Sequence, residues 1–292
     1  MSHVSPVGLF AHDSTAPPAS NRVLPLFSLA GKTAIVSGAT AGIGYAVAQG
    51  FAEAGANVAI WYNSKKEQAE AAAAEIEKDF GVKCKAYHVN VASFPAVSSA
   101  INDHILPEFN SRLDIFVANS GIAWEDGPML DGAAEDRIKR YKQIIDTNLD
   151  GTFYCARVAG EIFRRQKQEG LLEGFTYGSF IATASMSGSI VNIPQLQTAY
   201  NASKAGVIHL VKSLAVEWVG FARANTVSPG YIVTEISKFC DEGTKRAWRD
   251  KIPMGREGMP NELKGAYLYL ASDAASYTTG IDLVVDGGYC AP

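Results

Sequence analysis

The chain has 292 residues, of which 47% are hydrophobic and 19% are charged, and its formal net charge is −4. The charged share lies below the roughly 25% that is typical of soluble domains, which favours a well-filled core and excludes a disordered chain. The sequence also lacks the cluster of basic residues that nucleic-acid binding requires, and any apolar run near the roughly 20 residues needed to cross a bilayer.

Residues 1–28 are rich in proline and contain only two charged side chains, Asp13 and Arg22. A segment of this composition buries too little apolar surface to offset its ordering entropy, so we expect a flexible N-terminal tail. The segment shows neither the basic start and unbroken apolar stretch of a secretory signal nor the arginine-rich pattern of a transit peptide. A cytoplasmic location is therefore expected.

The four cysteines are far apart and form no CxxC pair, and the five histidines form no HExxH pattern. These absences predict that the protein has no metal site. We expect the cysteines to be reduced and to pack as small apolar side chains. They are Cys84, Cys155, Cys240 and Cys290.

Seven short segments rich in apolar and β-branched residues predict strands that are covered on both faces. They are Thr33–Ser37, Asn57–Tyr62, Val82–Val89, Leu113–Ala118, Gly178–Thr183, Ala224–Ser228 and Asp282–Val285. Helical sequences lie between them, among them Lys65–Phe80 and Thr198–Val219. This alternation predicts one α/β domain over residues 29–292, a doubly wound Rossmann fold whose mostly parallel seven-stranded sheet carries helices on both faces. Ligands of such sheets bind at the carboxyl ends of the strands.

A glycine-rich turn follows the first predicted strand and opens a helix: Gly38-Ala39-Thr40-Ala41-Gly42-Ile43-Gly44. Gly38 permits the tight turn, Gly42 lets the backbone approach a pyrophosphate, and Gly44 lets the helix pack closely on the strand. The free N–H groups of the helix would then face the anion. Glycines also simply end strands, but in this position the turn, with Thr40 and Ile43, predicts a dinucleotide site.

The end of the second predicted strand indicates which nucleotide is bound. An NAD enzyme usually places an acid there for the ribose 2′-hydroxyl, whereas an NADP enzyme must not repel the 2′-phosphate. No acid occurs before Glu67, and Asn63, Ser64 and Lys65 could bind the phosphate, so we expect NADP(H). The alternative is an ordinary polar loop in which Ser64 is the N-cap of the next helix.

Tyr200 and Lys204 lie four residues apart at the start of a predicted helix, so their side chains share one face. A nearby ammonium would lower the pKa of the tyrosine, which makes Tyr200 a candidate acid/base. Most Tyr–Lys pairs at this spacing are accidental. Ser185 changes that estimate, because it follows the fifth predicted strand at the same edge and could hold a substrate oxygen.

The conjunction of these residues resembles the short-chain dehydrogenase/reductase family from about Leu29 to the C-terminus. The matching residues occur in the family's order: Gly38–Gly44, Asn119-Ser120-Gly121, Asn148, Ser185, Tyr200, Lys204 and Pro229-Gly230. The resemblance implies that Tyr200 is the general acid/base, that Lys204 binds the nicotinamide ribose, that Ser185 positions the carbonyl, and that Asn148 holds a water. Asn119 and Gly121 would then lie along the cofactor.

The same resemblance assigns the remaining cofactor contacts. Pro229, Gly230, Ile232 and Thr234 would surround the nicotinamide amide. Asn90 and Val91 would lie at the adenine, although Asn90 replaces the family's common aspartate.

The spacing of the catalytic serine departs from the family pattern. Ser185 precedes Tyr200 by fifteen residues where thirteen is commoner, which makes Ser187 a rival. We favour Ser185, because it stands three residues before Gly188, and the extra residues then fall within 190–197.

This insertion, together with Ala59–Ser64 and the ending Asp286-Gly287-Gly288-Tyr289, resembles the fungal NADP-dependent polyol dehydrogenases and ketose reductases. That group includes mannitol 2-dehydrogenase, sorbose reductase and L-xylulose reductase. The resemblance implies a homotetramer assembled through helices at about Arg137–Gln168 and Thr198–Val219. Substrate selection is expected from Trp124, Gln195, Tyr231 and the segment Glu235–Lys251, which contains Phe239 and Trp248; packing or a closing flap is the alternative for each.

The leading hypothesis is NADPH-dependent reduction of a ketose, or the reverse oxidation of a polyol, with hydride from nicotinamide C4 and a proton from Tyr200. The alternative is a carbonyl reductase that acts on aryl or other non-sugar ketones. A non-catalytic NADP-binding sensor is a third hypothesis. A serine hydrolase is disfavoured, because Ser185 is not flanked by the glycines of a nucleophile elbow.

Overall fold

The computed structural model describes residues 15–18, 20–170 and 172–291, and its strands form one seven-stranded sheet. The strands are β1 (Thr33–Val36), β2 (Asn57–Tyr62), β3 (Cys84–His88), β4 (Ile115–Ala118), β5 (Gly178–Thr183), β6 (Ala222–Pro229) and β7 (Asp282–Val285). Their order is β3-β2-β1-β4-β5-β6-β7, and every neighbouring pair is parallel. The predicted doubly wound α/β fold is confirmed, and its sheet is parallel throughout.

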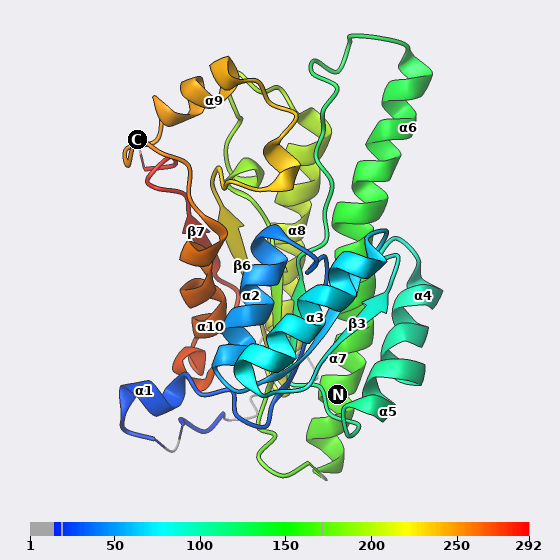
Figure 1. Cartoon of the computed structure of the whole chain (residues 1–292), viewed down its shortest axis with the longest axis vertical. Helices are drawn as coiled ribbons and strands as arrows, with labels where there is room; N and C mark the ends of the chain where they lie inside the picture. Colours follow the sequence, from blue (N-terminus) through cyan, green and yellow to red (C-terminus); the bar gives the residue numbers. More distant parts are fainter. Residues whose placement is uncertain (1–14, 19, 171, 292) are drawn as a thin grey trace, which may run out of the picture.

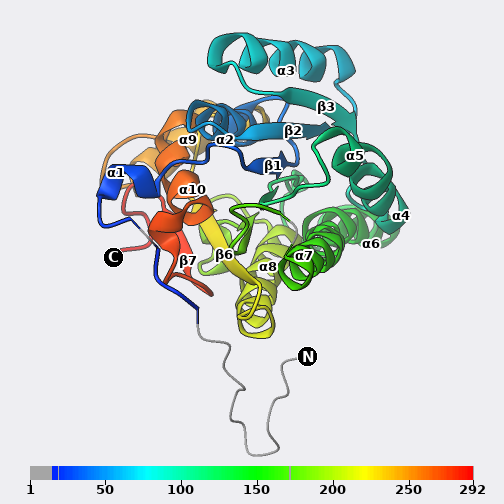
Figure 2. The ribbon, with the colours of Figure 1, turned by 90° about the horizontal axis from the view of Figure 1, so that it is seen from below.

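Helices cover both faces of the sheet, as predicted (Figure 1; Figure 2). One face carries α2 (Gly42–Glu53), α3 (Lys66–Phe80) and α10 (Lys264–Ala271), and the other carries α4 (Phe94–Ser99), α7 (Gly151–Glu169) and α8 (Thr198–Glu217). The remaining α-helices are α1 (Val23–Leu26), α5 (Leu106–Glu108), α6 (Ala134–Ile145) and α9 (Glu242–Arg249). Short 3₁₀ turns are η3 (Met186–Gly188), η4 (Glu235–Ser237), η5 (Pro260–Leu263) and η6 (Asp273–Ala275), and π-helical turns are η1 (Ala100–Ile105) and η2 (Asp146–Asp150).

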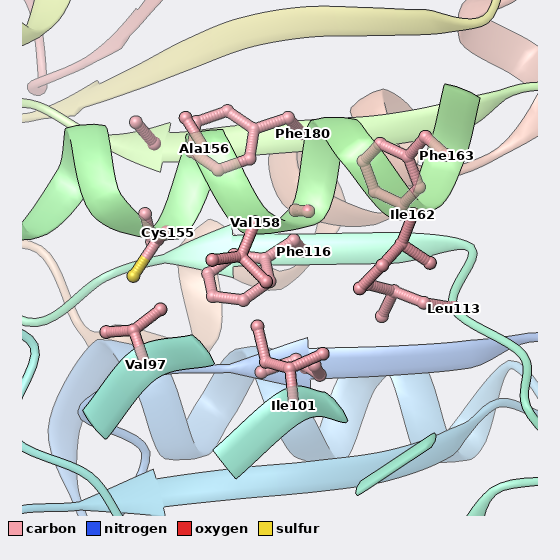
Figure 3. Packing of buried hydrophobic residues seen from close by; sticks show 14 of the residues in the cluster. Val97, Ile101, Leu113, Phe116, Cys155, Ala156, Val158, Ile162, Phe163 and Phe180 are labelled. Carbon is pink, nitrogen blue, oxygen red and sulfur yellow. The ribbon is translucent and has the colours of Figure 1, made fainter. Parts of the chain in front are cut away.

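The core on the α4–α7–α8 face is built from side chains of β4, β5 and these helices (Figure 3). Phe116 of β4 and Phe180 of β5 stack with their ring centroids 5.8 Å apart, and both are fully buried. Val158 and Ile162 of α7 pack in the same cluster. Because burying each such side chain contributes roughly 1.5–3 kcal/mol, this layer holds the sheet rigid and fixes where its strands end.

The order of the strands places a switch point between β1 and β4, which are neighbours in space but not in sequence. Chain leaving β1 turns toward α2 on one face, and chain leaving β4 passes toward α7 on the other. Such a point leaves a crevice outside the carboxyl ends of the strands. The segments after β1, β4, β5 and β6 therefore meet there.

The N-terminal segment that was predicted as a flexible tail is described only in part. Residues 1–14 lie outside the described residues, but Val23–Leu26 forms helix α1, and Leu29 is fully buried. The division of the chain at residue 28 stays a prediction. In the described part of the chain, no helix is both long enough and apolar enough to cross a membrane.

The helix predicted at about Arg137–Gln168 is interrupted. α6 passes into the π-helical turn η2 at Asp146, and regular α-helix resumes at Gly151 as α7. A π-turn adds one residue to the helical repeat, and such turns occur frequently at functional sites.

Candidate active site

A cavity of about 290 Å³ lies at the carboxyl edge of the sheet, between the glycine-rich turn, the start of α8 and the segment after β6. Most of the predicted site residues line it: Gly38, Gly42, Ile43, Gly44, Asn119, Gly121, Ser185, Tyr200, Lys204, Pro229, Gly230, Ile232 and Thr234. The other predicted residues do not line it: Thr40, Asn63, Ser64, Lys65, Asn90, Val91 and Asn148. The fold thus brings the expected catalytic and nicotinamide-side residues into one place.

The glycine-rich turn has the backbone that the sequence predicted. Gly38 and Gly42 have φ values of +62° and +59°, which side chains rarely adopt. A Cβ on Gly44 would lie 2.3 Å from the Gly38 carbonyl oxygen, so only glycine allows the helix to pack this closely on the turn. Helix α2 begins at Gly42, and its free N–H groups border the cavity. This cradle fits a pyrophosphate group.

Asn119 joins the ends of three strands. Its Nδ2 donates to the carbonyl oxygens of Ser37 and Gly38, at 3.1 Å each, and its Oδ1 accepts from the Thr183 hydroxyl at 3.1 Å. The Ser37 hydroxyl in turn accepts from the backbone N–H groups of Asn119 and Ser120, at 2.9 Å each. The side-chain amide of Asn119 therefore holds the backbone of the glycine-rich turn in place at the edge of the cavity.

Ser185, Tyr200 and Lys204 come together in the cavity. The Ser185 hydroxyl lies close enough to the Tyr200 phenol to lower its pKa. The Lys204 Nζ lies 5.6 Å from the centre of the Tyr200 ring and donates to the Thr183 carbonyl oxygen at 2.7 Å. Ser185 and Lys204 are buried, at 8% and 4% exposure. A phenol, an alcohol and an ammonium therefore share one small desolvated space.

Burial governs the pKa values of this group. Desolvation raises the pKa of the Tyr200 phenol, and the Ser185 hydroxyl opposes that rise only in part. Desolvation also lowers the pKa of Lys204 to about 8. Lys204 is not among the groups that shift the pKa of Tyr200 here, and its ammonium donates to the Thr183 carbonyl oxygen, so the lowering of the Tyr200 pKa by Lys204 stays a prediction.

Asn148 lies in the π-helical turn η2 and is 1% exposed. Its amide accepts from the backbone N–H of Ile122 at 2.9 Å and donates to the Ile122 carbonyl and to the Ser203 hydroxyl, at 3.1 Å each. The Cβ position of Gly121 lies 3.3 Å from the Asn148 Oδ1 and 3.6 Å from the Lys204 Nζ. Asn148 therefore adjoins Lys204 across Gly121 without lining the cavity.

The residues expected at a 2′-phosphate lie on the surface beyond the cavity. Asn63, Ser64 and Lys65 are all exposed. The N-cap of α3 is Lys65 and its side chain makes no capping bond, so the alternative with Ser64 as N-cap is wrong. The pKa of Glu235, which lines the cavity, is lowered first by its hydrogen bond to Lys238 and also by the charge of Lys65. The charge of Lys65 is thus near enough to influence Glu235 at the edge of the cavity.

Asn90 and Val91 follow β3 at the far side of the turn. Asn90 is exposed, and its Oδ1 accepts from the backbone N–H of Ala92 at 3.1 Å, which forms a local turn. Val91 is 7% exposed and packs against Gly151, whose added Cβ would lie 3.0 Å from it. Asn90 therefore stabilises a local turn, and Val91 packs against α7.

The wall opposite the glycine-rich turn contains most of the residues expected to select a substrate. Gln195, Tyr231, Phe239 and Trp248 line the cavity. Trp124 does not: it is 2% exposed, its Nε1 donates to the Gly127 carbonyl at 2.7 Å, and it packs in a cluster with residues of α6 and α8. The prediction for Trp124 is wrong, and the packing alternative holds.

The arrangement matches known proteins over nearly the whole chain. Residues 38–290 match the family model that is described as enoyl-(acyl carrier protein) reductase. The L-xylulose reductase of Hypocrea jecorina is 64% identical over 98% of this chain and 99% of its own. The chain belongs to the short-chain dehydrogenase/reductase family. The probable NADP-dependent mannitol dehydrogenase of Yarrowia lipolytica is 51% identical over 98% of this chain and 97% of its own.

A solved structure of a family member has the same fold. The NADPH-dependent 3-quinuclidinone reductase from Rhodotorula rubra superposes with a TM-score of 0.87 at 41% identity, covering 96% of this chain and 99% of its own.

The geometry separates the two serines that family spacing left open. The Ser185 hydroxyl is near enough to the Tyr200 phenol to lower its pKa, whereas the Ser187 hydroxyl accepts from Gln197 Nε2 at 3.0 Å. Gly188 allows this turn to lie against α8, since a Cβ there would stand 2.8 Å from the Lys204 carbonyl carbon. The serine that stands three residues before Gly188 is thus the one beside the short-chain dehydrogenase/reductase tyrosine.

Several cavity residues were missed by sequence reasoning. Met186 and Gln197 line the cavity, and the Thr183 carbonyl holds Lys204. A backbone carbonyl carries no residue signature, and Met186 and Gln197 lie in irregular segments without periodicity. Within the described residues, no group of three histidine, cysteine, aspartate or glutamate side chains could hold a metal ion.

Proposed function

We propose that the protein is an NADP(H)-dependent oxidoreductase that reduces a ketose or, in the reverse direction, oxidises a polyol. The observation that carries the proposal is that Ser185, Tyr200 and Lys204 line one cavity, which begins at the glycine-rich turn, with the Lys204 Nζ 5.6 Å from the centre of the Tyr200 ring. The 64% identity with an L-xylulose reductase and the 51% identity with a probable mannitol dehydrogenase support the sugar class of substrate.

The residues of the cavity suit transfer of a proton to a carbonyl oxygen. Ser185 would hold the oxygen by a hydrogen bond, and Tyr200 would donate its phenolic proton to it. Because burial raises the pKa of Tyr200, the phenol stays protonated at neutral pH and is ready for reduction. Lys204 would stabilise the negative charge that the phenol acquires. When bound, the nicotinamide supplies the hydride.

The cofactor would lie across the carboxyl edge of the sheet. The turn from Gly38 to Gly44, with Thr40 and Ile43, would bind the pyrophosphate, and Asn63, Ser64 and Lys65 the 2′-phosphate. Asn119 and Gly121 would border the cofactor, and Pro229, Gly230, Ile232 and Thr234 would surround the nicotinamide amide. Asn90 and Val91 are proposed at the adenine. Asn148 would order a water beside Lys204.

A second candidate function is the reduction of non-sugar ketones. The cavity wall contains the apolar side chains of Phe239 and Trp248, which favour an aryl or bicyclic ketone. The similar structure of a 3-quinuclidinone reductase supports the same alternative.

The test is a steady-state comparison of L-xylulose, fructose, sorbose and an aryl ketone, following NADPH consumption at 340 nm. Reduction of a ketose with the highest kcat/KM is expected, and a preference for the aryl ketone would favour the second candidate. A Tyr200→Phe variant should lose roughly 10²–10⁴-fold in kcat, because it lacks the proton donor. NADPH binding without turnover of any carbonyl would contradict both functions.

A homotetramer and a cytoplasmic location remain part of the proposal. Ile138, Tyr141 and Phe153 on α6 and α7 are 56%, 48% and 48% exposed, which supports association through these helices. All four cysteines are free, as expected in a reducing compartment.

A further inference from the structure

A chain of buried side-chain hydrogen bonds crosses the substrate side of the cavity. Gln197 Nε2 donates to the Ser187 hydroxyl at 3.0 Å and to Asn192 Oδ1 at 2.8 Å. Asn192 Nδ2 then donates to the Tyr231 hydroxyl at 3.0 Å. The bonds join the turn after β5, the insertion at residues 190–197 and the segment after β6.

The two amides are buried, Asn192 at 1% and Gln197 at 6% exposure. A buried polar atom without a partner is costly, so the chain has little freedom to rearrange. Because Gln197 occupies the oxygen of Asn192, the nitrogen of Asn192 faces Tyr231. The hydrogen bond from Gln197 to Asn192 therefore makes Asn192 the donor in its bond to Tyr231.

Other contacts hold the Tyr231 ring. It stacks on Trp248 of α9, with ring centroids 4.0 Å apart and planes 7° apart. The Tyr289 ring contacts it edge-on, with ring centroids 5.5 Å apart. Lys251, just beyond α9, donates to the Ile193 carbonyl at 2.9 Å, so the insertion and the α9 segment are tied at a second point.

This chain also reaches the catalytic residues. Gln197 stands three residues before Tyr200, as the N-cap of α8, and Ser187 stands two residues after Ser185. Tyr231 lines the same cavity as both catalytic side chains. The chain of hydrogen bonds therefore links the position of the Tyr231 phenol to the segments that hold Ser185 and Tyr200.

We propose that Asn192 and Gln197 are positioning residues for substrate selection, which hold Tyr231 so that its hydroxyl hydrogen-bonds a hydroxyl group of the ketose. The inference rests on the proposed function. A ketose carries hydroxyl groups beside its carbonyl, and a fixed polar group in a desolvated wall discriminates strongly for a substrate that pairs with it. Asn192 acts through Tyr231 and makes no contact with the substrate itself.

The test is a double-mutant cycle with Asn192→Leu and Tyr231→Phe, at saturating NADPH, on the ketose that the wild-type enzyme reduces fastest. Loss of one hydrogen bond should raise KM for each single variant about tenfold, with kcat within about threefold. Because both changes remove the same substrate contact, the KM of the double variant should also be about tenfold above that of the wild-type enzyme. A KM raised near a hundredfold in the double variant would overturn the inference. A fall in kcat with unchanged KM for Asn192→Leu would overturn it as well.

The matched control is Asn225→Leu. Asn225 is a fully buried asparagine of β6 whose amide bonds to Thr278 and Ile281, outside the cavity. Its replacement should lower thermal stability without coupling to Tyr231→Phe, and equal coupling would contradict the inference. If Asn192→Leu does not fold, Asn192→Ser replaces it in the cycle, since serine is too short to span from Gln197 to Tyr231, and the same outcomes decide.

Failure of the proposed function gives a different result. A wild-type protein that consumes no NADPH with any ketose overturns both proposals before a variant is made. A wild-type protein that reduces a ketose while the two variants act additively overturns only the role of Asn192 and Gln197.

Discussion

The ammonium of Lys204 donates its short hydrogen bond, 2.7 Å long, to the carbonyl oxygen of Thr183, the last residue of β5. A strand end thereby fixes the position of a charge that belongs to the first turns of α8. The bond orients the ammonium, but it does not restore the solvation that burial removes. The resulting shift in the pKa of Lys204 has consequences for both rate and stability.

The pH dependence of reduction should follow Lys204. Its pKa is lowered to about 8, whereas the pKa of Tyr200 is raised, so the lysine loses its proton first. We expect kcat/KM for the ketone to be constant from about pH 6 to pH 7.5 and to fall as pH rises through about 8. Lys204→Arg, which stays charged, should remove that fall if it retains activity. A flat wild-type profile up to pH 9.5 would contradict the assignment.

Lys204→Met should make the protein inactive but more stable. An ammonium whose pKa is about 8 in the folded protein and about 10.4 in the unfolded chain costs stability at neutral pH. Replacement should raise the free energy of unfolding at pH 7 by about 1–3 kcal/mol, after allowing for the lost hydrogen bond.

The sign can be checked with pH. Between about pH 8 and 10.4 the unfolded chain binds more protons at this position than the folded protein, so wild-type stability should rise with pH relative to Lys204→Met. Urea unfolding of both proteins at pH 7 and pH 10 measures the difference. A stability gap that does not narrow at the higher pH would refute the shift.

The two serines should differ in their effect on turnover. Ser185→Ala removes the hydroxyl beside the Tyr200 phenol and should lower kcat roughly 10²–10³-fold, as does removal of an oxyanion donor. Ser187→Ala removes one of two acceptors of Gln197 and should lower kcat by about fivefold at most, since the bond to Asn192 remains. Steady-state kinetics at saturating NADPH compare them, and the reverse ranking would make Ser187 the catalytic serine.

Asn63→Asp should change the cofactor preference. A carboxylate at this exposed position would repel the 2′-phosphate, so we expect NADPH to bind about tenfold more weakly. NADH, which lacks that phosphate, should be affected by about threefold or less. Asn102→Asp makes the same charge change on an exposed turn outside the cavity and serves as the control. An unchanged ratio of the two dissociation constants would show that Asn63 is not at the phosphate.

The parts of the fold and site that sequence predicts are those with a local pattern. The alternation of strand and helix segments allowed the parallel sheet to be predicted. The left-handed backbone of Gly38 and Gly42 explains why glycines occur at these positions. Tyr200 and Lys204 share a face of α8 because of helical spacing alone. Their approach to Ser185 followed from the rule that parallel strands end at one edge.

The parts that sequence does not predict depend on contacts between distant segments. Nothing local distinguishes Asn192 and Gln197 from ordinary loop residues, because their partners lie up to 39 residues away. The rise in the pKa of Tyr200 depends on the desolvation of its phenol by distant segments, which only the packed structure reveals. The residue type of Trp124 likewise suggested a substrate contact, but residues of α6 and α8 pack around its side chain.

The π-helical turn at Asp146–Asp150 also sets a relation between two surfaces. One residue corresponds to about 100° of rotation in a regular helix, so the turn offsets the phase of α6 from that of α7 by about that angle. Deleting a single residue there would leave both helices intact, yet it would rotate Ile138 and Tyr141 of α6 relative to Phe153 of α7. The same deletion would displace Asn148 from Gly121. The position of Asn148 and the relative directions of the exposed side chains on α6 and α7 therefore depend together on one extra residue in a helix.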